Sequence, residues 1–551
     1  MFQYSILFTR TQEPTPKKSE KILAFLLIRQ PGCATIVTGI KRYSRADVFG
    51  RLPAEKGEEP GMLAMAVRNT RKLIREKSAS DNVRLGRFFT KREAAAKMAS
   101  MFTFLETMPL MEILDPGAGT GILSAALLEA VCLGRAAQEV RLVCYENDAL
   151  YIPMLKNNLE RLRRRAKREH GVKVTYEVRE ENFLLAPHPE TGDTYDCVIM
   201  NPPRELLLRG APETLPAEDL LSSPKVDACY LFLAAAALRL KDEGQLVADL
   251  PVGFATGVSL SRLREAVFDD FRLTGMHLFR SGKGLKKDFL LSLKKTDEPG
   301  EPVTVSVSRE SEADGTLTEQ LPPLPYSMIV RENGAGLLLL RDADDLTVLR
   351  RMAALPRRFS DYGLRMKTGL TLPSRYPDLL ADKPEPGAVP LIHPRSLGSG
   401  RVTFPAKGLH GQFIRPSIPS LIQKNRNMLL LKRFPAKSDP RKLICAVYMA
   451  SQAGGYRFIS THNKLNYVDR EGDEMDAPFL VGLYAALSGT LYNRYVSIIS
   501  RSEQINATEL SDLPLPDETT LRAVGSRLLA MRRLDPEACD VTFEAALKAA
   551  K

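Results

Sequence analysis

The stretch MEILDPGAGTGILSAALLEAV, residues 111–131, gives the first indication of the fold. An apolar run ends at Asp115, a glycine-rich turn follows, and an apolar helical pattern begins near Ile122. Gly117, Gly119 and Gly121 let the backbone turn sharply and approach a ligand closely, while the helix start presents free N–H groups. A glycine-rich turn can also be ordinary punctuation after a strand. It lacks the lysine followed by Ser/Thr that marks a phosphate-cradling P-loop.

Short apolar segments recur after this stretch and alternate with helical patterns. The apolar segments are MEILDP (111–116), RLVCYEN (141–147), CVIMNPP (197–203) and GQLVADLP (244–251). Strands that alternate with helices of this length are typical of a parallel, doubly wound sheet. The sequence therefore predicts an α/β fold with a mostly parallel sheet.

Polar residues stand at the tips of four successive predicted strands. They are Asp115, Glu146, Asn182 (followed by Phe183) and Asn201. Open α/β sheets bind ligands at the carboxyl ends of their strands, so one site can contain all four. An acid at the tip of the second strand can accept both hydroxyls of a ribose, although Glu146 could also be a plain solvated acid. An isolated Asn-Pro-Pro is most often a turn, because proline cannot continue a ladder.

Composition divides the rest of the chain into further parts. Residues 1–80 form an N-terminal extension of unknown role, and residues 81–300 form the α/β domain. A polar segment rich in Pro, Gly and acidic residues predicts a linker at 301–340. Shorter, irregular strands with interleaved basic residues then predict a mixed α+β domain at 341–520, followed by a C-terminal helical segment at 521–551.

The charge balance favours a polyanionic partner. The 551 residues include 78 Lys and Arg against 66 Asp and Glu, a formal charge of +12, so nucleic acid is the first expectation. Seven cysteines occur without a CxxC pair, and the six histidines show no ligand spacing, so neither disulfides nor a metal site is expected. The apolar runs are too short to span a membrane. We therefore expect a soluble, cytoplasmic protein.

Taken together, several motifs resemble the adenine-specific DNA methyltransferases of restriction-modification systems. GRFFTKREAAAKMA (86–99) is similar to the first motif of that family, and DPGAGTG, YEN, ENFL and NPP follow in the family's order. In the carboxyl half, VPLIHPRSLGSGRV (389–402), residues 427–448, STHNKLNYV (460–468) and residues 503–516 look like its target-recognition domain. The resemblance covers about residues 82–520, and its combination of motifs is more specific than any single one.

This resemblance implies S-adenosylmethionine as the cofactor and double-stranded DNA as the substrate. The implied cofactor-binding residues are Phe89, Thr90, Asp115, Pro116, Gly117, Gly119, Gly121, Glu146, Asn182 and Phe183. The implied catalytic residues are Asn201, Pro202, Pro203 and Arg204. A cognate restriction endonuclease would be a separate partner chain, because no cluster of acids with lysine marks a nuclease centre in this sequence.

The chemistry of methyl transfer to adenine explains these residue types. The exocyclic amine is a poor nucleophile because its lone pair is delocalised into the ring. If the Asn201 side-chain oxygen and the Pro202 carbonyl accept its two N–H groups, the nitrogen becomes more tetrahedral and its lone pair can face the methyl group. The prolines keep the carbonyl aimed. The adenine must also be flipped out of the duplex to reach such a pocket.

Two positions depart from the family pattern. Arg204 stands where the family has an aromatic residue that stacks on the flipped adenine, and Asn182 stands where an aspartate is common. A guanidinium plane can stack on a base, with Leu206 or a neighbouring apolar side chain shielding one face, or Arg204 can instead point outward to a phosphate. These departures keep open a catalytically weak or silent DNA-binding homologue. An RNA methyltransferase with the same loop is a further alternative.

Basic residues in the carboxyl half alternate with Leu, Phe and Pro over strand-like segments. This pattern suits a sheet surface that follows phosphates and reads base edges. The predicted DNA-binding residues are Lys424, Arg426, Lys432, Arg433, Lys437, Arg441 and Lys442.

Overall fold

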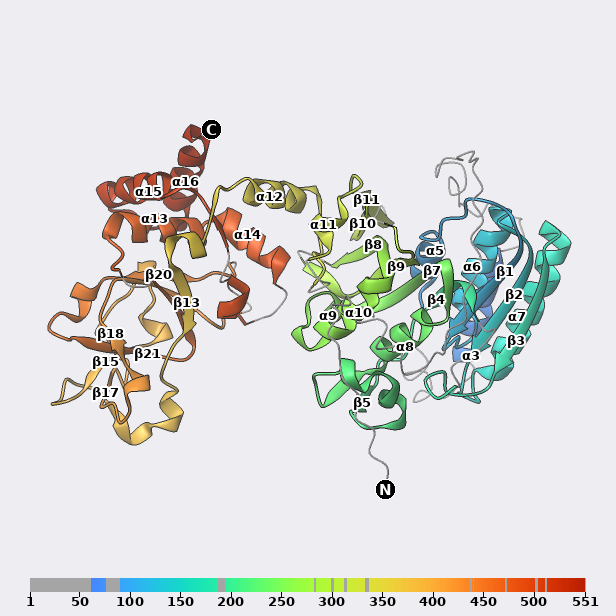
Figure 1. Ribbon diagram of the computed structural model, residues 1–551, viewed down its shortest axis with the longest axis horizontal. Helices are drawn as coiled ribbons and strands as arrows, with labels where there is room; N and C mark the ends of the chain where they lie inside the picture. The colour runs from blue at the N-terminus through green and yellow to red at the C-terminus, as the bar shows by residue number, and fades with distance from the viewer. Residues whose placement is uncertain are drawn as a thin grey trace, which may run out of the picture. The chain divides into compact units, whose positions relative to one another are not determined.

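The computed structural model describes most of the chain from residue 61 onward. The described residues are 61–75, 90–186, 194–281, 284–298, 302–311, 315–331, 336–436, 439, 441–470, 473–500, 504–510 and 513–550. The chain divides into two compact units, with the boundary between Arg341 and Asp342 (Figure 1). Each unit is described by itself.

The first unit is built on a nine-stranded sheet with the order β11-β10-β8-β9-β7-β4-β1-β2-β3 (Figure 1). Its strands are β1 (Met108–Pro116), β2 (Ala137–Tyr145), β3 (Lys173–Arg179), β4 (Tyr195–Met200), β7 (Leu240–Pro251), β8 (Phe271–Ser281), β9 (Gly284–Lys295), β10 (Thr304–Ser311) and β11 (Gly315–Gln320). A separate hairpin pairs β5 (Leu206–Leu208) with β6 (Lys225–Asp227).

Parallel pairing dominates the half of the sheet that carries the predicted motifs. β1 pairs in parallel with both β2 and β4, and β4 pairs in parallel with β7. β9 then runs antiparallel to β7 and β8. The predicted α/β class with a doubly wound, mostly parallel sheet is confirmed. The consequence for function is that the loops after β1, β2, β3, β4 and β7 all leave the same edge.

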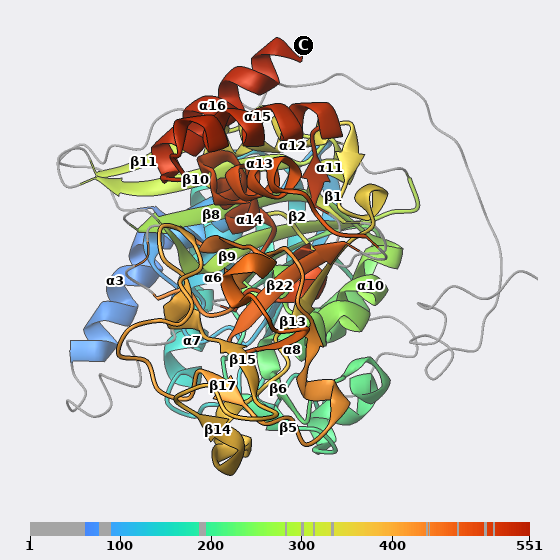
Figure 2. The same ribbon diagram turned by 90° about the vertical axis from the view of Figure 1, so that its left-hand side faces the viewer.

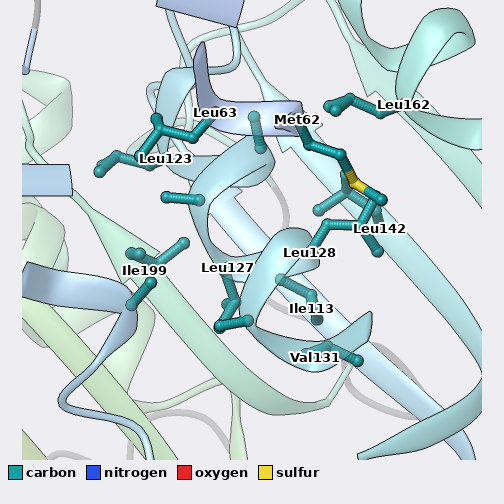
Figure 3. Close-up of a cluster of buried hydrophobic side chains, with 14 of the residues drawn as sticks. Met62, Leu63, Ile113, Leu123, Leu127, Leu128, Val131, Leu142, Leu162 and Ile199 are labelled. Carbon is teal, nitrogen blue, oxygen red and sulfur yellow. The ribbon is translucent and has the colours of Figure 1, made fainter. Parts of the chain in front are cut away.

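Helices bury their apolar residues against this sheet. α6 (Ile122–Leu133) is buried along almost its whole length and packs beside α3 (Met62–Arg75), α5 (Arg92–Ala99) and α7 (Ile152–Arg165). Figure 3 shows Met62 and Leu63 of α3 in one buried cluster with Leu123 of α6 and Ile113 of β1. Farther along the chain follow α8 (Ala228–Ala237), α9 (Gly253–Thr256), α10 (Ser261–Asp270) and α11 (Tyr326–Ile329).

Two predicted boundaries need correction. Residues 301–340 are not simply a linker, because β10 and β11 extend the nine-stranded sheet. Val303, Val305 and Val307, from the alternating segment VTVSVS, are buried in the core. This alternation indicates a strand, but the polar residues around it favoured a linker. Within the predicted extension 1–80, α3 belongs to the core of the α/β unit. Its apolar residues recur at helical spacing, but the basic residues between them obscure this signal.

The second unit contains two five-stranded sheets. The first has the order β13-β22-β19-β20-β16, and the second has the order β14-β17-β15-β21-β18. The strands of the first are β13 (Leu364–Thr368), β22 (Leu465–Arg470), β19 (Met428–Lys432), β20 (Cys445–Tyr448) and β16 (Gly400–Arg401). Those of the second are β14 (Leu380–Ala381), β17 (Phe413–Ile414), β15 (Val389–Ile392), β21 (Phe458–Thr461) and β18 (Gln423–Lys424). A short ladder joins β12 (Arg357–Arg358) to β23 (Pro514–Leu515).

Helices complete the second unit. They are α12 (Ala343–Ala353), α13 (Ala477–Ser488), α14 (Thr490–Ile499), α15 (Glu518–Met531) and α16 (Pro536–Ala549). α13 packs against α15 so closely that a Cβ on Gly482 or Gly525 would meet backbone atoms at 1.9 or 1.8 Å. Figure 2 shows α13, α15 and α16 layered together, so the predicted C-terminal helical segment is integral to this unit. Across the described residues, every helix is too short or too polar to cross a membrane.

One buried ion pair fastens α12 to α14. Arg494 donates from Nε to Oδ1 of Asp345 at 2.7 Å, and it also pairs with Asp342. Asp345 is fully buried, whereas Arg494 is 29% exposed. Removing the cation would therefore leave a carboxylate without its main source of compensation.

We expect Arg494→Met to lower the free energy of unfolding of the second unit by about 3 kcal/mol, because breaking a buried pair leaves an uncompensated charge. Urea unfolding monitored by circular dichroism measures this loss. Arg351→Met is the matched control, because it breaks an exposed pair with Glu544 and should cost at most about 1 kcal/mol. Equal losses in the two variants would contradict the assignment.

Candidate functional site

A cavity of about 840 Å³ opens at the carboxyl edge of the parallel strands. Ten of the residues predicted from the sequence line this cavity. The predicted residues that line it are Thr90, Gly117, Gly119, Glu146, Asn182, Phe183, Asn201, Pro202, Pro203 and Arg204. Asp115, Pro116 and Gly121 do not line it, and Phe89 lies outside the described residues.

The glycine-rich turn wraps around the end of β2. The backbone N–H groups of Gly117 and Ala118 both donate to the Tyr145 carbonyl, at 2.9 and 2.8 Å. Gly117 has a φ of 81° and Gly121 has a φ of 82°, a region that L side chains rarely adopt. The turn therefore requires glycine at these positions, and it presents its backbone to the cavity before α6 begins.

Asp115 has a structural position behind this turn. Its Oδ2 accepts from the backbone N–H of Ser124 at 3.1 Å and from the Ser124 hydroxyl at 2.6 Å. Burial raises the pKa of Asp115 to about 7, although the Ser124 hydrogen bonds oppose that rise. The expectation that Asp115 contacts the cofactor is thus corrected. A carboxylate directly after a strand can face into the following helix as well as into a site.

Glu146 directly follows β2 and contacts the glycine-rich turn. Its Oε2 accepts from the Gly119 backbone N–H at 2.8 Å, and its Oε1 accepts from the Asp148 N–H at 2.8 Å. Burial raises the pKa of Glu146, while these backbone N–H groups lower it. A carboxylate has about four lone-pair directions, and backbone N–H groups of Gly119, Asp148 and Asn147 use three of them. Acceptor capacity therefore remains for a ribose hydroxyl.

Asn201 is oriented by a residue from far away in the chain. Its Nδ2 donates to the hydroxyl oxygen of Thr90 at 2.9 Å. The amide nitrogen is thereby fixed, which leaves the Oδ1 oxygen as the acceptor on the other side of the side chain. Pro202 and Pro203 follow in the cavity wall and restrict the loop. The segment predicted as the family's first motif thus contacts the predicted catalytic residue directly.

An aromatic wall forms one side of the cavity. The buried ring of Phe183 contacts Tyr145 and Phe232, with ring centroids 5.0 and 5.3 Å apart. The Arg239 guanidinium covers Phe183 at 4.6 Å from its centroid. Phe232 and Tyr145 were not among the predicted site residues. Phe232 lies in the apolar helix α8, and no local signal in the sequence distinguishes an aromatic that lines a cavity from one in the core.

Asn182 makes a local turn in this wall. Its Oδ1 accepts from the Leu184 backbone N–H at 3.1 Å. The predicted hydrogen bond from the cofactor to this oxygen would therefore compete with the hydrogen bond from Leu184. Asn commonly bonds its own backbone two residues on, so the geometry follows from the residue type.

Arg204 is directed into the protein. Its Nη2 donates to the Asp249 backbone carbonyl at 2.9 Å and lies 3.4 and 3.6 Å from the carboxylates of Asp249 and Asp288. The side chain is 25% exposed. Leu206, expected to shield a stacked guanidinium, is 69% exposed on β5. The stacking arrangement expected for Arg204 is thus replaced by an ion pair with the tips of β7 and β9.

Asp249 is the partner that sequence reasoning missed. Burial raises its pKa to about 7, Arg204 lowers it and Asp288 raises it. Met200 pairs with Ala248 across β4 and β7, so Asp249 stands beside Asn201 at adjacent strand tips. The available signal was a charged residue near the end of the apolar segment GQLVADLP. That signal names no partner by itself.

The predicted DNA-binding residues have two different placements in the second unit. Lys424 is exposed on β18, while Arg426, Lys432 and Arg433 are partly exposed around β19. Arg441 instead donates to the Ser488 carbonyl and pairs with Asp540 at 3.5 Å, and Lys442 donates to the Ser500 carbonyl at 2.6 Å. These two side chains stabilise the ends of helices, so the prediction that they are free to bind DNA is corrected. Lys437 lies outside the described residues.

The Arg204 pair leads to a pH-dependent prediction. We expect Arg204→Tyr to lower the free energy of unfolding by about 1 to 3 kcal/mol at pH 8.5, because Asp249 would be buried without its cation. Since the pKa of Asp249 is about 7, the loss should shrink at pH 5.5, where the carboxyl is protonated in both proteins. Urea unfolding at both pH values measures it.

The double variant Arg204→Tyr/Asp249→Leu provides the control for this measurement. It removes both charges, so it should recover stability at pH 8.5 and abolish the difference between the two pH values. A loss in Arg204→Tyr that is independent of pH would contradict the ion pair.

No family model matches the chain. The chain is 26% identical over 467 residues to the type II methyltransferase M.PstI of Providencia stuartii, covering 81% of this chain and 89% of that protein. It is 23% identical over 460 residues to the type II methyltransferase M.BsuBI of Bacillus subtilis, covering 80% and 89%.

Among solved structures, the methyltransferase subunit of a type I restriction-modification system from Streptococcus thermophilus matches with a TM-score of 0.33 and 20% identity, over 41% of this chain and 48% of that chain. The similarity to the two type II methyltransferases extends over most of both sequences. It confirms the resemblance to restriction-modification methyltransferases that the motifs predicted, and S-adenosylmethionine is the cofactor that this similarity implies.

Proposed function

We propose that this chain is a DNA methyltransferase that transfers a methyl group from S-adenosylmethionine to the exocyclic amine of adenine in a specific duplex sequence. The similarity to type II methyltransferases supports methyl transfer to DNA. One observation supports an amine as the group that receives the methyl: Thr90 fixes the Asn201 side chain in the same cavity as the glycine-rich turn. In this proposal the chain modifies DNA, and any cognate endonuclease is a separate chain.

The residues around the turn fit the cofactor. Gly117 and Gly119 leave backbone exposed to the cavity, the Glu146 carboxylate offers acceptors for ribose hydroxyls, and Phe183 provides an apolar wall for an adenine ring. S-adenosylmethionine, when bound, supplies an electrophilic methyl group on its sulfonium sulfur. The rest of the proposed mechanism concerns how the protein prepares the acceptor amine.

The Asn-Pro-Pro loop prepares the amine by hydrogen bonding. The Oδ1 of Asn201 and the carbonyl of Pro202 would each accept one N–H of the target amine. Both hydrogens then lie on one side of the nitrogen, and its lone pair points to the other side. Thr90 prevents Asn201 from presenting its Nδ2 in place of Oδ1, because that nitrogen already donates to the Thr90 hydroxyl. No strong base is required, because the nitrogen would become positively charged and acidic as it gains the methyl group and S-adenosylhomocysteine leaves. Its extra proton would then pass to water.

The second unit is proposed to read the DNA. Lys424, Arg426, Lys432 and Arg433 belong to two neighbouring stretches of strand and loop and retain partial or full exposure. Phosphate contacts by such residues release counterions, so binding should weaken with salt. Base contacts by these residues would supply the sequence preference.

A weak or silent DNA-binding homologue is the second candidate. Two observations favour it: Arg204 pairs with Asp249 and offers no aromatic face, and the Asn182 oxygen is used in its own turn. Incubation of the protein with radiolabelled S-adenosylmethionine and duplex DNA, single-stranded DNA or RNA separates the candidates. Label in duplex adenine supports the proposal, label in RNA supports an RNA methyltransferase, and cofactor binding without transfer supports the silent homologue.

We expect Asn201→Ala to reduce methyl transfer to duplex DNA by about 10²- to 10³-fold, because it removes one of the two acceptors that orient the amine. Affinity for S-adenosylhomocysteine, measured by calorimetry, should change little. Asn147→Ala is the matched control, because Asn147 also lines the cavity but does not follow β4. Full activity in Asn201→Ala would exclude the proposed role of the loop.

We expect Glu146→Ala to weaken binding of S-adenosylmethionine by about 1 to 3 kcal/mol, the cost of leaving polar ligand groups unpaired. Calorimetry measures this change. Glu181→Ala tests whether any acid at the cavity would have the same effect, because Glu181 lines the cavity without following β2. The ribose assignment is refuted if Glu146→Ala binds the cofactor as tightly as the unmodified chain, or if Glu181→Ala weakens binding equally.

A further inference from the structure

Helix α3 contacts the glycine-rich turn from behind. This helix has no role in the sequence-based assignment, in which it belonged to an extension of unknown function. In the structure it packs against α6 and α7. Its residues Met62 and Leu63 (Figure 3), together with Ala66 and Val67, are buried in the core of the α/β unit. Its polar residues make a second set of contacts that point to the turn.

A chain of buried hydrogen bonds joins α3 to Thr120 in the turn. The hydroxyl oxygens of Thr70 and Thr120 are 2.7 Å apart. Thr70 donates its only proton to the Ala66 carbonyl at 2.9 Å, so Thr120 must donate to Thr70. Thr70 is 2% exposed and Thr120 is 1% exposed. The hydroxyl of the turn residue is therefore committed to α3, away from water.

A second branch fixes the backbone of the same residue. Asn158 on α7 donates from Nδ2 to the Thr120 carbonyl at 2.8 Å, and its Oδ1 accepts from Nδ2 of Asn69 on α3 at 2.7 Å. Asn158 is fully buried. Thr120 is thus held through its side chain by Thr70 and through its carbonyl by Asn158. Loss of either partner would leave a buried polar group unsatisfied.

Thr120 is the side chain through which this part of the turn can be held. It lies between Gly119 and Gly121, which both have positive φ and no side chain. The Gly119 N–H donates to Glu146 on the cavity side. Contacts from α3 and α7 on the buried side therefore oppose the contact from Glu146 on the cavity side. Together they fix the position of backbone that is proposed to touch the cofactor.

The start of α3 is fixed by the helix that follows the turn. The carboxylate of Glu129 on α6 accepts hydrogen bonds from the backbone N–H groups of Met62 and Leu63. Burial raises the pKa of Glu129, and these hydrogen bonds oppose the rise. A Cβ on Gly61 would come within 2.2 Å of the Glu129 Oε1, so the two elements approach closely. α3 is held at its first turn by α6 and contacts the turn before α6 eight residues later.

From these contacts we propose that α3 is part of the cofactor site and that Thr70 is a positioning residue for the glycine-rich turn. Thr70 does not touch the cavity and acts through Thr120, which lines it. The inference rests on the proposed binding of S-adenosylmethionine at this turn. It predicts that loss of the Thr70 hydroxyl lowers cofactor affinity selectively, without altering the handling of DNA.

The test is Thr70→Val, which keeps the shape of the side chain and removes the hydroxyl. We expect the Kd for S-adenosylhomocysteine, measured by calorimetry, to rise about 5- to 30-fold, because the Thr120 hydroxyl loses its buried acceptor. The KM for S-adenosylmethionine should rise with it, while the KM for duplex DNA stays unchanged. Thr70→Ser restores the hydroxyl and should recover most of the affinity.

Leu63→Ala is the matched control on the same helix. It removes apolar contacts of α3 and should lower Tm, yet Leu63 has no hydrogen bond to the turn, so the Kd should remain within about twofold of the unmodified chain. If Thr70→Val does not fold, Asn69→Ala tests the second branch, because Asn69 is only partly buried. A smaller rise in Kd is then expected.

The outcomes separate this inference from the proposed function. An unmodified chain that fails to bind S-adenosylhomocysteine overturns the cofactor assignment and this inference with it. Normal binding by the unmodified chain together with an unchanged Kd in Thr70→Val overturns the inference alone. An equal rise in Kd for Thr70→Val and Leu63→Ala also overturns it, because general loss of stability would then explain the effect.

Discussion

Parallel pairing of β1 with β2 on one side and with β4 on the other is the constraint on which the site depends. The register aligns Asp115 with Cys144, and Leu114 with Val198, so the strands end close to one level. Backbone hydrogen bonds along these ladders thereby bring the turns after the strands to one edge. A shift of one residue would turn every side chain to the opposite face and separate the glycine-rich turn from Asn201.

The sheet places the turns, but buried polar contacts determine their conformation. Glu146 accepts from Gly119 on the open side, and Thr120 is held by Thr70 on the closed side. Asn201 is oriented by Thr90, more than a hundred residues earlier. In each case a residue distant in sequence supplies the partner that a local segment lacks. The α/β unit therefore depends on α3 as well as on the segments with recognisable motifs.

Much of this arrangement follows from the sequence, because strand tips and turns have local signals. The alternation of apolar segments predicted the parallel sheet, and the polar residues after them predicted which edge carries the cavity. Local signals fail where the partner is distant: Asp115 faces Ser124 in the helix, and Arg204 pairs with Asp249 on another strand. Arg441 likewise satisfies a helix carbonyl, although its basic surroundings suggested DNA. The type of a residue alone does not predict whether its side chain points into the protein or toward a ligand.

Arg204 shows how a charged residue can occupy a partly buried loop at the cavity wall. An isolated guanidinium there would carry a large desolvation cost. The Asp249 carbonyl and the carboxylates of Asp249 and Asp288 offset that cost within the protein, so the charge need not be neutralised by a ligand. The same pair joins the loop after β4 to the ends of β7 and β9. Arg204, which stands where the resembling family has an aromatic residue, thus connects the ends of three neighbouring strands. Asn201 lies on the loop that Arg204 fixes in place.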